Sequence, residues 1–163
     1  MQAIYDELIP GKAVWDFCCD HGYLGIHALK SGQFPQIHFV DQASHLVHRL
    51  ENLWREKRHE SPEHVNAYFH PYSGEKVLNE IHGTAVIAGV GAHTILQIVE
   101  EVMAKNLLKA DRLILCAQRD EELLVVTFAS NTSLCSAYNC TKELSVLERG
   151  RIRKLLIFDR KGT

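Results

Sequence analysis

The sequence predicts an α/β fold with a mostly parallel, seven-stranded sheet and an antiparallel hairpin at its C-terminal end. Two observations support this prediction. Short β-rich runs alternate with longer helical stretches, and after about Asn131 two β-rich segments follow one another directly. Strands that alternate with helices indicate β–α–β units with right-handed crossovers, which build a parallel sheet. A chain of 163 residues is typical of one domain, which we expect to span residues 1–163.

The predicted strands are compact apolar runs of strand length and strand-favouring composition. They are Ala13–Cys18, Ile37–Asp41, Val65–Phe69, Ala85–Val90 and Leu113–Ala117. Helices are expected between them, at Tyr23–Ser31, Ser44–Arg58, Gly74–Ile81, Thr94–Lys105 and Glu121–Ala129. The strongest pattern is that of Ser44–Arg58, where apolar residues recur three and four positions apart. We expect Trp15, Leu113 and Phe158 in the core.

The C-terminal hairpin is predicted by Leu134–Leu147 and Ile152–Asp159, two β-rich segments separated by Glu148–Arg151. Gly150 in this connection can adopt a positive φ, which the tight turns of hairpins often require. An antiparallel hairpin after five β–α units is less typical of a dehydrogenase, which more often ends with another β–α unit.

Composition excludes several classes of protein. The formal charge is −2, and 46% apolar with 23% charged residues is ordinary for a globular protein. A disordered chain, a collagen-like repeat and a small disulfide scaffold are therefore excluded. No apolar run approaches the ~18 residues that a membrane helix needs, and the N-terminus lacks the features of a signal peptide. We expect no membrane association.

Cysteine usage predicts reduced thiols and a cytoplasmic location. The five cysteines are odd in number and lack any C-x-x-C spacing. We therefore expect neither a disulfide framework nor a metal site. The histidines offer no H-x-x-x-H pair with an acid in support, and His45-x-x-His48 favours a solvated helix face.

The loop after the first predicted strand, residues 16–23, carries most of the functional signal, because ligands of open α/β sheets bind beyond the carboxyl ends of the strands. It lacks the G-x-G-x-x-G fingerprint of dinucleotide sites, since only Gly22 and Gly25 are present. Asp16 and Asp20 would also repel a pyrophosphate. A donor without phosphate that carries a sulfonium and an ammonium suits this loop, and S-adenosylmethionine is such a molecule.

Asp41 is the second candidate for cofactor binding. It ends the second predicted strand, 25 positions after Asp16, close to the ~20-residue offset at which an acid accepts hydrogen bonds from ribose hydroxyls. The alternative is that Asp41 caps the helix that begins at Ser44, because acids favour helix starts. The sequence leaves both interpretations open.

Three segments share their pattern with one known family. Residues 16–25 read D-F-C-C-D-H-G-Y-L-G, residues 86–92 read V-I-A-G-V-G-A, and residues 113–122 read L-I-L-C-A-Q-R-D-E-E. These segments resemble D-I-G-[SC]-D-H-[AG]-Y-L-P, V-I-A-G-M-G-G and L-I-L-Q-P-N-x-x-E-E of the bacterial tRNA (adenine-N1)-methyltransferases. The resemblance covers roughly residues 1–160, including the hairpin at 143–159. It implies a Rossmann-like class I methyltransferase fold, S-adenosylmethionine as the cofactor and tRNA as the substrate.

The resemblance also implies roles for individual residues. Those beside the incoming base would be Asp20, His21 and Tyr23. Those that bind the cofactor would be Asp16, Cys18, Gly22, Asp41, Gln42, Gly89 and Gly91. Asp20 could stabilise the charge that develops on an N1-methylated adenine or accept its proton.

Each of these roles has a structural alternative. Asp20 could form an Asx-turn that shapes the loop, and His21 could be a structural histidine rather than a base. Gly89 and Gly91 could permit the turn into the next helix.

The chain departs from the family pattern in several places. Cys18 replaces the first motif glycine, Gly25 the proline, Ala92 the second glycine of a pair, and residues 70–74 (H-P-Y-S-G) a G-D-G segment. Three functions therefore stay open. The first is a methyltransferase, the second is a degenerate relative that binds without turnover, and the third is a nucleotide-binding oxidoreductase, which the acidic loop and the hairpin disfavour.

An RNA partner is suggested by two basic clusters, although the overall charge is slightly negative. The first cluster lies in and after Ser44–Arg58. The second, on the hairpin, consists of Arg149, Arg151, Arg153 and Lys154. Alternating Arg151 and Arg153 would share one face of a strand. The alternative is an ordinary solvated surface, and the sequence does not indicate the oligomeric state.

Overall fold

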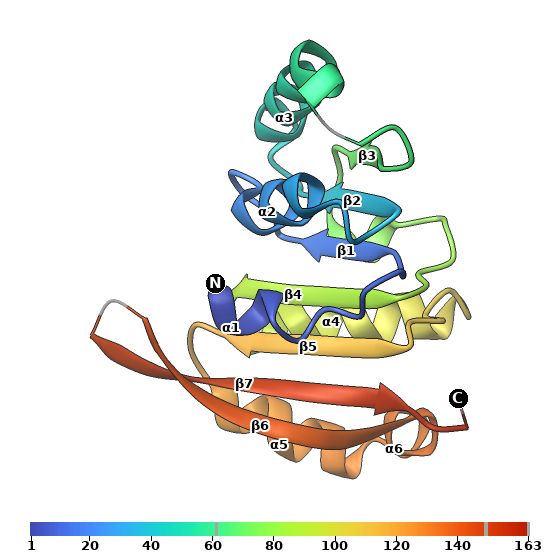
Figure 1. Cartoon of the computed structure of the whole chain (residues 1–163). Coiled ribbons are helices and arrows are strands. Elements are labelled where there is room, and N and C mark those ends of the chain that lie inside the picture. Colours follow the sequence, from blue (N-terminus) through green and yellow to red (C-terminus); the bar gives the residue numbers. More distant parts are fainter. Residues whose placement is uncertain (61, 149, 163) are drawn as a thin grey trace.

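A single sheet crosses the molecule from end to end (Figure 1). In this computed structural model, which describes residues 1–60, 62–148 and 150–162, the sheet has seven strands in the order β3-β2-β1-β4-β5-β7-β6. Strands β1 to β5 are parallel, and β7 pairs antiparallel with both β5 and β6. Their bounds are Val14–Phe17 (β1), Gln36–Val40 (β2), Asn66–His70 (β3), Thr84–Val90 (β4), Arg112–Ala117 (β5), Tyr138–Glu148 (β6) and Arg151–Arg160 (β7). The predicted fold class is confirmed.

Helices cover both faces of the sheet (Figure 1). Side chains of α1 and α2 join one buried apolar cluster, and side chains of α4, α5 and α6 join the other. The bounds of the helices are Gln2–Tyr5 (α1), Tyr23–Ser31 (α2), Ser44–Lys57 (α3), Ala92–Ala104 (α4), Glu121–Ser130 (α5) and Thr132–Ala137 (α6). Two short 3₁₀ turns are Arg58–Glu60 (η1) and Gly74–Lys76 (η2).

The alternation of side chains along β1 decides which of them reach the site. Trp15 and Phe17 belong to the cluster on the α4 side, whereas Val14 belongs to the cluster on the α2 side. Because successive strand residues point to opposite faces, Asp16 points with Val14 toward α2. The predicted core residues are buried as expected, with exposed fractions of 2% for Trp15, 0% for Leu113 and 5% for Phe158.

The helix predicted at Gly74–Ile81 is wrong, because only the 3₁₀ turn η2 forms there. Val77 and Ile81 are buried and four positions apart, which looks helical in the sequence. The backbone of Ile81 instead hydrogen-bonds across to the chain around Leu108, with Ile81 N–H donating to the Leu107 carbonyl at 2.8 Å. This long-range pairing holds the segment extended.

The strand segment predicted to begin at Leu134 begins four residues later, at Tyr138. Asn131 accepts a hydrogen bond from the Leu134 N–H through its side-chain oxygen at 3.1 Å, which caps the short helix α6. The hairpin itself is confirmed, and Gly150 has a φ of +78° as expected.

Candidate functional site

The candidate site lies at the point where the strand order reverses. The chain runs from β1 outward to β2 and β3, then crosses back to β4 on the other side of β1. In open α/β sheets, ligands bind at such a switch point, outside the carboxyl ends of the strands. We refer to this position, between the loops that follow β1 and β4, as the crevice. Residues 16–23, at the end of β1, in the loop that follows it and at the start of α2, include six of the ten candidate site residues.

The backbone of this loop is tightly wound. Cys18, Asp20 and Gly22 all have a positive φ, of +56°, +50° and +67°. Cys19 N–H donates to the Val40 carbonyl at 3.2 Å, and Gly22 N–H donates to the Cys19 carbonyl at 2.7 Å. Left-handed backbone is costly for Cys and less so for Asp. The surrounding contacts thus hold Cys18 in a conformation that glycine would adopt freely.

Asp16 is a buried carboxyl at the base of the crevice, with 6% of its surface exposed. Its Oδ2 accepts a hydrogen bond from the Gly25 N–H at 3.1 Å, at the start of α2. Burial raises the pKa of Asp16 to about 7, with the Gly25 hydrogen bond lowering it and the charge of Asp41 raising it further. Near neutral pH, a cation placed beside Asp16 would favour its ionised form.

Asp41 holds the backbone of two segments together. Its Oδ2 accepts from the Asp20 N–H at 2.9 Å, and its Oδ1 accepts from the Ala43 N–H at 2.8 Å, just before α3. The alternative that Asp41 caps α3 is wrong, because the N-cap of α3 is Ala43 and no described side chain caps this helix. Each carboxylate oxygen keeps a second lone pair that a ribose hydroxyl could use. Gln42 is exposed, and its carbonyl accepts from the Ser44 N–H at 2.9 Å.

Asp20, His21 and Tyr23 form a continuous exposed group beside the crevice. His21 Nδ1 lies 2.9 Å from Asp20 Oδ1. The rings of His21 and Tyr23 are parallel within 6°, with their centroids 5.7 Å apart. Within the described chain, the Asp20 carboxylate contacts His21 and makes no Asx-turn. The three side chains thus present two aromatic planes and an acid to solvent.

The glycines of the two loops have different roles. A Cβ at Gly22 would lie 2.8 Å from Leu50 Cδ1, and one at Gly25 would lie 2.3 Å from Phe39 Cε1. These glycines let α2 approach β2 and α3 closely. Gly89 has a φ of +81° at the bulge between Ala88 and Val90. Gly91 immediately precedes α4, so Gly89 and Gly91 do shape the turn into this helix.

Glu75 is an acid near the β1 loop that the sequence did not single out. It lies in η2, after β3, beyond residues 70–74 that replace the family's G-D-G. The pKa of Cys18 is raised to about 12 by burial first, then by the charges of Asp41, Asp16 and Glu75. Glu75, in the segment that follows β3, is therefore an acid whose charge helps to raise the pKa of Cys18 in the β1 loop. Its position in the one-turn η2 could not be read from a pattern that predicted a longer helix.

A pair of imidazoles, a buried His38 and a partly buried His70, also lies next to the segment that follows β3. His38 Nδ1 and His70 Nε2 are 3.0 Å apart, and His70 Nδ1 lies 2.9 Å from the Tyr72 hydroxyl. Trp15 stacks on His38 with a centroid distance of 3.7 Å. Burial, together with the neighbouring charge of His70, lowers the pKa of His38 to about 3. Both rings are neutral at pH 7, since burial lowers the pKa of His70 as well.

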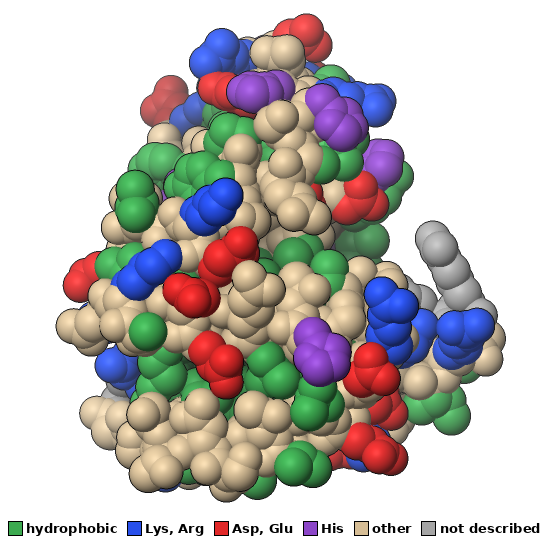
Figure 2. All heavy atoms as spheres, turned by 180° about the vertical axis from the view of Figure 1, so that it is seen from behind, with side chains coloured by type: hydrophobic (Ala, Val, Ile, Leu, Met, Phe, Trp, Pro, Cys, Tyr) green, Lys and Arg blue, Asp and Glu red, His purple; other side chains and the backbone are tan. Residues whose placement is uncertain are grey.

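The two basic clusters are partly neutralised by neighbouring groups. Arg55 pairs with Glu51 at 2.6 Å, and Lys154 pairs with Glu143 at 3.0 Å. Arg153 donates to the carbonyl of Gln118, just after β5, so this arginine reaches the carboxyl edge of the sheet. Arg149 lies outside the described residues. Figure 2 shows basic and acidic side chains interspersed over one face of the molecule.

Within the described ranges, no cluster of three or more His, Cys, Asp or Glu side chains is placed to hold a metal ion. The helices of this part of the chain also lack the length and apolar character of a membrane span. All five cysteines are free thiols.

Comparisons with solved structures find the same fold in other proteins. Among solved structures, Sp1610 of Streptococcus pneumoniae has a TM-score of 0.75 at 20% identity, covering 98% of this chain and 68% of that one. The B. subtilis m1A22 tRNA methyltransferase TrmK has a TM-score of 0.74 at 17% identity, covering 97% and 64%. M. capricolum TrmK, solved with S-adenosyl-homocysteine, has a TM-score of 0.69 at 16% identity, covering 98% and 67%.

These structural likenesses support the fold. No curated protein sequence matches the chain significantly. The methyltransferase domain family matches residues 1–156, nearly the whole chain. This chain therefore belongs to the methyltransferase domain family.

Proposed function

We propose that this protein is an S-adenosylmethionine-dependent methyltransferase that acts on RNA, with N1 of a tRNA adenine as the acceptor. The observation that carries the proposal is the buried Asp16 carboxyl at the strand-order switch point, poised between its charged and neutral forms. Membership of the methyltransferase domain family and the likeness to two proteins named TrmK support it. A tRNA substrate would also fit the cytoplasmic location expected from the free cysteines.

The residues present suit the cofactor. A buried carboxyl that has no cationic partner among the described residues favours a ligand that brings a positive charge, and Asp16 is such a group. Asp16 and the loop at Cys18 and Gly22 would hold the methionine end, while Asp41 and Gln42 would lie at the ribose. Gly89 and Gly91, without side chains, leave room at the mouth of the crevice. When bound, S-adenosylmethionine supplies an electrophilic methyl group on its sulfonium.

The exposed group of Asp20, His21 and Tyr23 would receive the acceptor base. The parallel rings of His21 and Tyr23 offer a surface on which a purine can stack, a contact worth about 1–3 kcal/mol per base. Asp20 would stabilise the positive charge that adenine acquires on N1 methylation, or accept its amine proton. Most of the rate would come from holding the base in line with the methyl group.

The hairpin would supply contacts to the RNA backbone. Arg153 donates a hydrogen bond to the carbonyl of Gln118, just after β5. Arg151 is exposed and lies two residues earlier on the same face of β7. Arginines on this edge of the sheet lie on the side from which a substrate would approach the crevice. Such contacts give affinity with a steep salt dependence and no sequence selectivity.

A second candidate function is a relative that binds the cofactor without transferring a methyl group. The observation that favours it is Cys18, a residue with a positive φ where the related motif has glycine. Its side chain is partly buried and packs against the core. Under this proposal it would lie at the methionine end of the cofactor. A thiol there could crowd the cofactor.

Methylation of a tRNA pool with labelled S-adenosylmethionine, comparing wild type with Asp20→Asn, tests the proposal. The amide keeps the shape of Asp20 but loses its charge, so cofactor binding should stay nearly unchanged. Methyl transfer should slow by about 10²-fold, the typical contribution of a positioned proton acceptor, which corresponds to about 2.7 kcal/mol. Equal turnover would reduce Asp20 to a loop-shaping residue. No turnover by wild type, despite cofactor binding, would favour the second candidate.

A further inference from the structure

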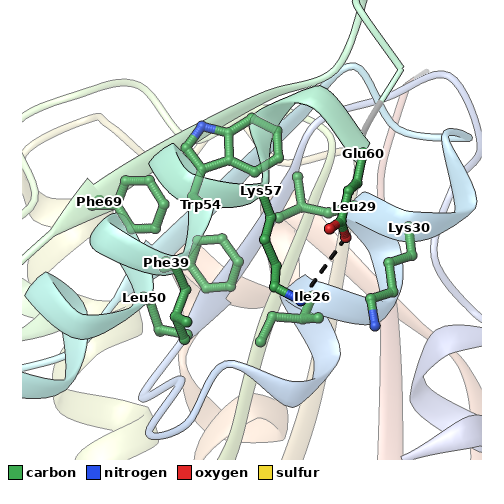
Figure 3. Close-up of a pocket in the computed structure, with 10 residues that line it drawn as sticks. Ile26, Leu29, Lys30, Phe39, Leu50, Trp54, Lys57, Glu60 and Phe69 are labelled. Carbon is green, nitrogen blue, oxygen red and sulfur yellow. Dashed lines mark ion pairs between the residues drawn. The ribbon is translucent and has the colours of Figure 1, made fainter.

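A separate pocket lies between α2 and α3, on the face of the sheet formed by β2 and β3 (Figure 3). Its volume is about 270 Å³. Its walls are apolar and its rim is charged, and it contains none of the candidate site residues. The lining residues are Ile26, Leu29, Lys30, Phe39, Leu50, Leu53, Trp54, Lys57, Glu60 and Phe69.

The floor of the pocket is rigid because it belongs to the core. Phe39 and Leu50 are only 1% and 6% exposed. The Phe39 ring stacks on Phe69 within 3°, with their centroids 5.3 Å apart. Gly25 of α2 lies directly against Phe39, where a side chain would collide with the ring. The close approach of this glycine fixes the ring of Phe39, so the floor of the pocket keeps its shape.

Charge is concentrated at one end of this pocket. In Figure 3 the rings of Phe39, Trp54 and Phe69 lie toward one side, and the heads of Lys30, Lys57 and Glu60 lie toward the other. Lys57 Nζ and Glu60 Oε2 are 3.9 Å apart, and both side chains are more than half exposed. Lys30 has no ion pair with any residue of the described ranges. The three charged side chains of the rim therefore carry a net charge of +1, and Lys57 is held only loosely by Glu60.

We propose that this pocket binds a medium-chain monocarboxylate, with its apolar body against the aromatic floor and its carboxylate between Lys30 and Lys57. Charge complementarity selects the anion, because both lysines of the rim can donate to its carboxylate. Glu60 opposes this binding, since its own carboxylate repels that of the ligand. The volume lies just below the range of about 300–1,000 Å³ typical of drug-sized ligands, so the body must be small. The apolar lining selects against a nucleotide, whose base needs hydrogen-bonding partners.

Calorimetric titration of the whole chain with decanoate, kept below its micellar concentration, tests the proposal. We expect saturable binding of decanoate. Octanoate should bind about tenfold more weakly, because each methylene contributes roughly three- to fourfold in affinity. Decyltrimethylammonium has the same alkyl chain with the opposite charge and should not bind. Equal binding of the cation, or no binding of decanoate, would overturn the proposal.

Three variants of exposed residues test the charged rim without threatening the fold. Lys30→Gln combined with Lys57→Gln should weaken decanoate binding by roughly tenfold, whereas Glu60→Gln should strengthen it by about two- to fivefold. Lys76→Gln, an exposed lysine outside the pocket, serves as the control and should change nothing. Opposite signs for the double lysine variant and Glu60→Gln distinguish ligand contact from loss of the ion pair between Lys57 and Glu60. Shifts in the same direction would contradict the assignment.

Discussion

Asp16 shows at the scale of one residue how burial prepares a group for a ligand. Its pKa of about 7 follows mainly from desolvation. A cationic ligand needs the ionised form, so affinity for S-adenosylhomocysteine, whose ammonium would face Asp16, should fall as the pH drops through 7. Between pH 7.5 and 6.0 we expect a loss of up to about tenfold. Calorimetry at both values measures it. Asp16→Asn should bind weakly and with little pH dependence, and the same pH dependence in that variant would remove Asp16 from the site.

Cys18 carries a second prediction at this scale. Its φ of +56° is unfavourable for a side chain, and left-handed backbone costs about 1–2 kcal/mol. Cys18→Gly removes that cost, but glycine loses more conformational entropy on folding than cysteine does. The free energy of unfolding should therefore rise by about 0.5–1 kcal/mol. Cofactor affinity should rise as well if the thiol crowds the methionine end. Both are measurable, by denaturant titration and by calorimetry.

The neighbouring Cys19 provides a matched control for this substitution. Cys19 is buried, with 8% exposed, and does not have a positive φ. Cys19→Gly should therefore lower the free energy of unfolding, by about 1–2 kcal/mol. A loss of stability in Cys18→Gly equal to that in Cys19→Gly would show that Cys18 is held without strain.

Some of these residues could be predicted from sequence and others could not. Asp16 and Gly22 belong to one short sequence motif, so their position at the β1 loop could be predicted from the neighbouring residues alone. The hydrogen bonds that Asp41 accepts from the Asp20 and Ala43 backbone N–H groups depend on where β1 and β2 lie in space. The contact between His38 and His70 joins positions 32 residues apart and arises only from strand pairing.

At the scale of elements, the periodic segments were predictable and the irregular ones were not. The predicted bounds of Tyr23–Ser31 agree with α2, because apolar spacing and a following glycine both mark that helix. Residues 74–81 carry a helical spacing that the backbone pairing of Ile81 overrides. The cap at Asn131 turns residues 132–137 into a helix although their composition is also compatible with a strand.

The hairpin is the element on which the RNA proposal can be tested. Removing an arginine that contacts a phosphate should lower the slope of log affinity against log salt by roughly 1. We expect Arg151→Gln with Arg153→Gln to reduce the slope for tRNA binding by up to about 2, as measured by filter binding at several salt concentrations. The control is Lys12→Gln, because Lys12 precedes β1 and lies at the amino ends of the parallel strands, away from their carboxyl ends. Unchanged binding of the double variant at every salt concentration would assign the RNA surface elsewhere.

At the scale of the whole molecule, the imidazole pair of His38 and His70 should make stability depend on pH. His38 has a pKa of about 3 in the folded state and 6.5 as its ordinary value. Below pH 6.5 the unfolded chain therefore binds more protons at this residue, and stability falls as the pH decreases. From pH 7 to 5 this contribution should be about 1–2 kcal/mol, as measured by denaturant unfolding.

Asp16 has the opposite sign, because its raised pKa makes stability increase as the pH falls from about 7 toward 4. The contribution of His38 is therefore best measured as the difference between wild type and His38→Gln at each pH. His82→Gln, at an exposed histidine beside Glu80, is the control and should show no such difference. A difference for His38→Gln that stays constant from pH 7 to 5 would contradict a neutral, buried His38.

We expect the acidic loop at the switch point to bind a cationic adenosyl ligand rather than a dinucleotide. Calorimetric titration with S-adenosylhomocysteine and with NAD, side by side on the same protein, tests it most directly. The buried Asp16 and the nearby Asp41 would repel a pyrophosphate and attract an ammonium. We expect saturable binding of S-adenosylhomocysteine and no measurable binding of NAD. Tight binding of NAD, with no binding of S-adenosylhomocysteine, would contradict the account.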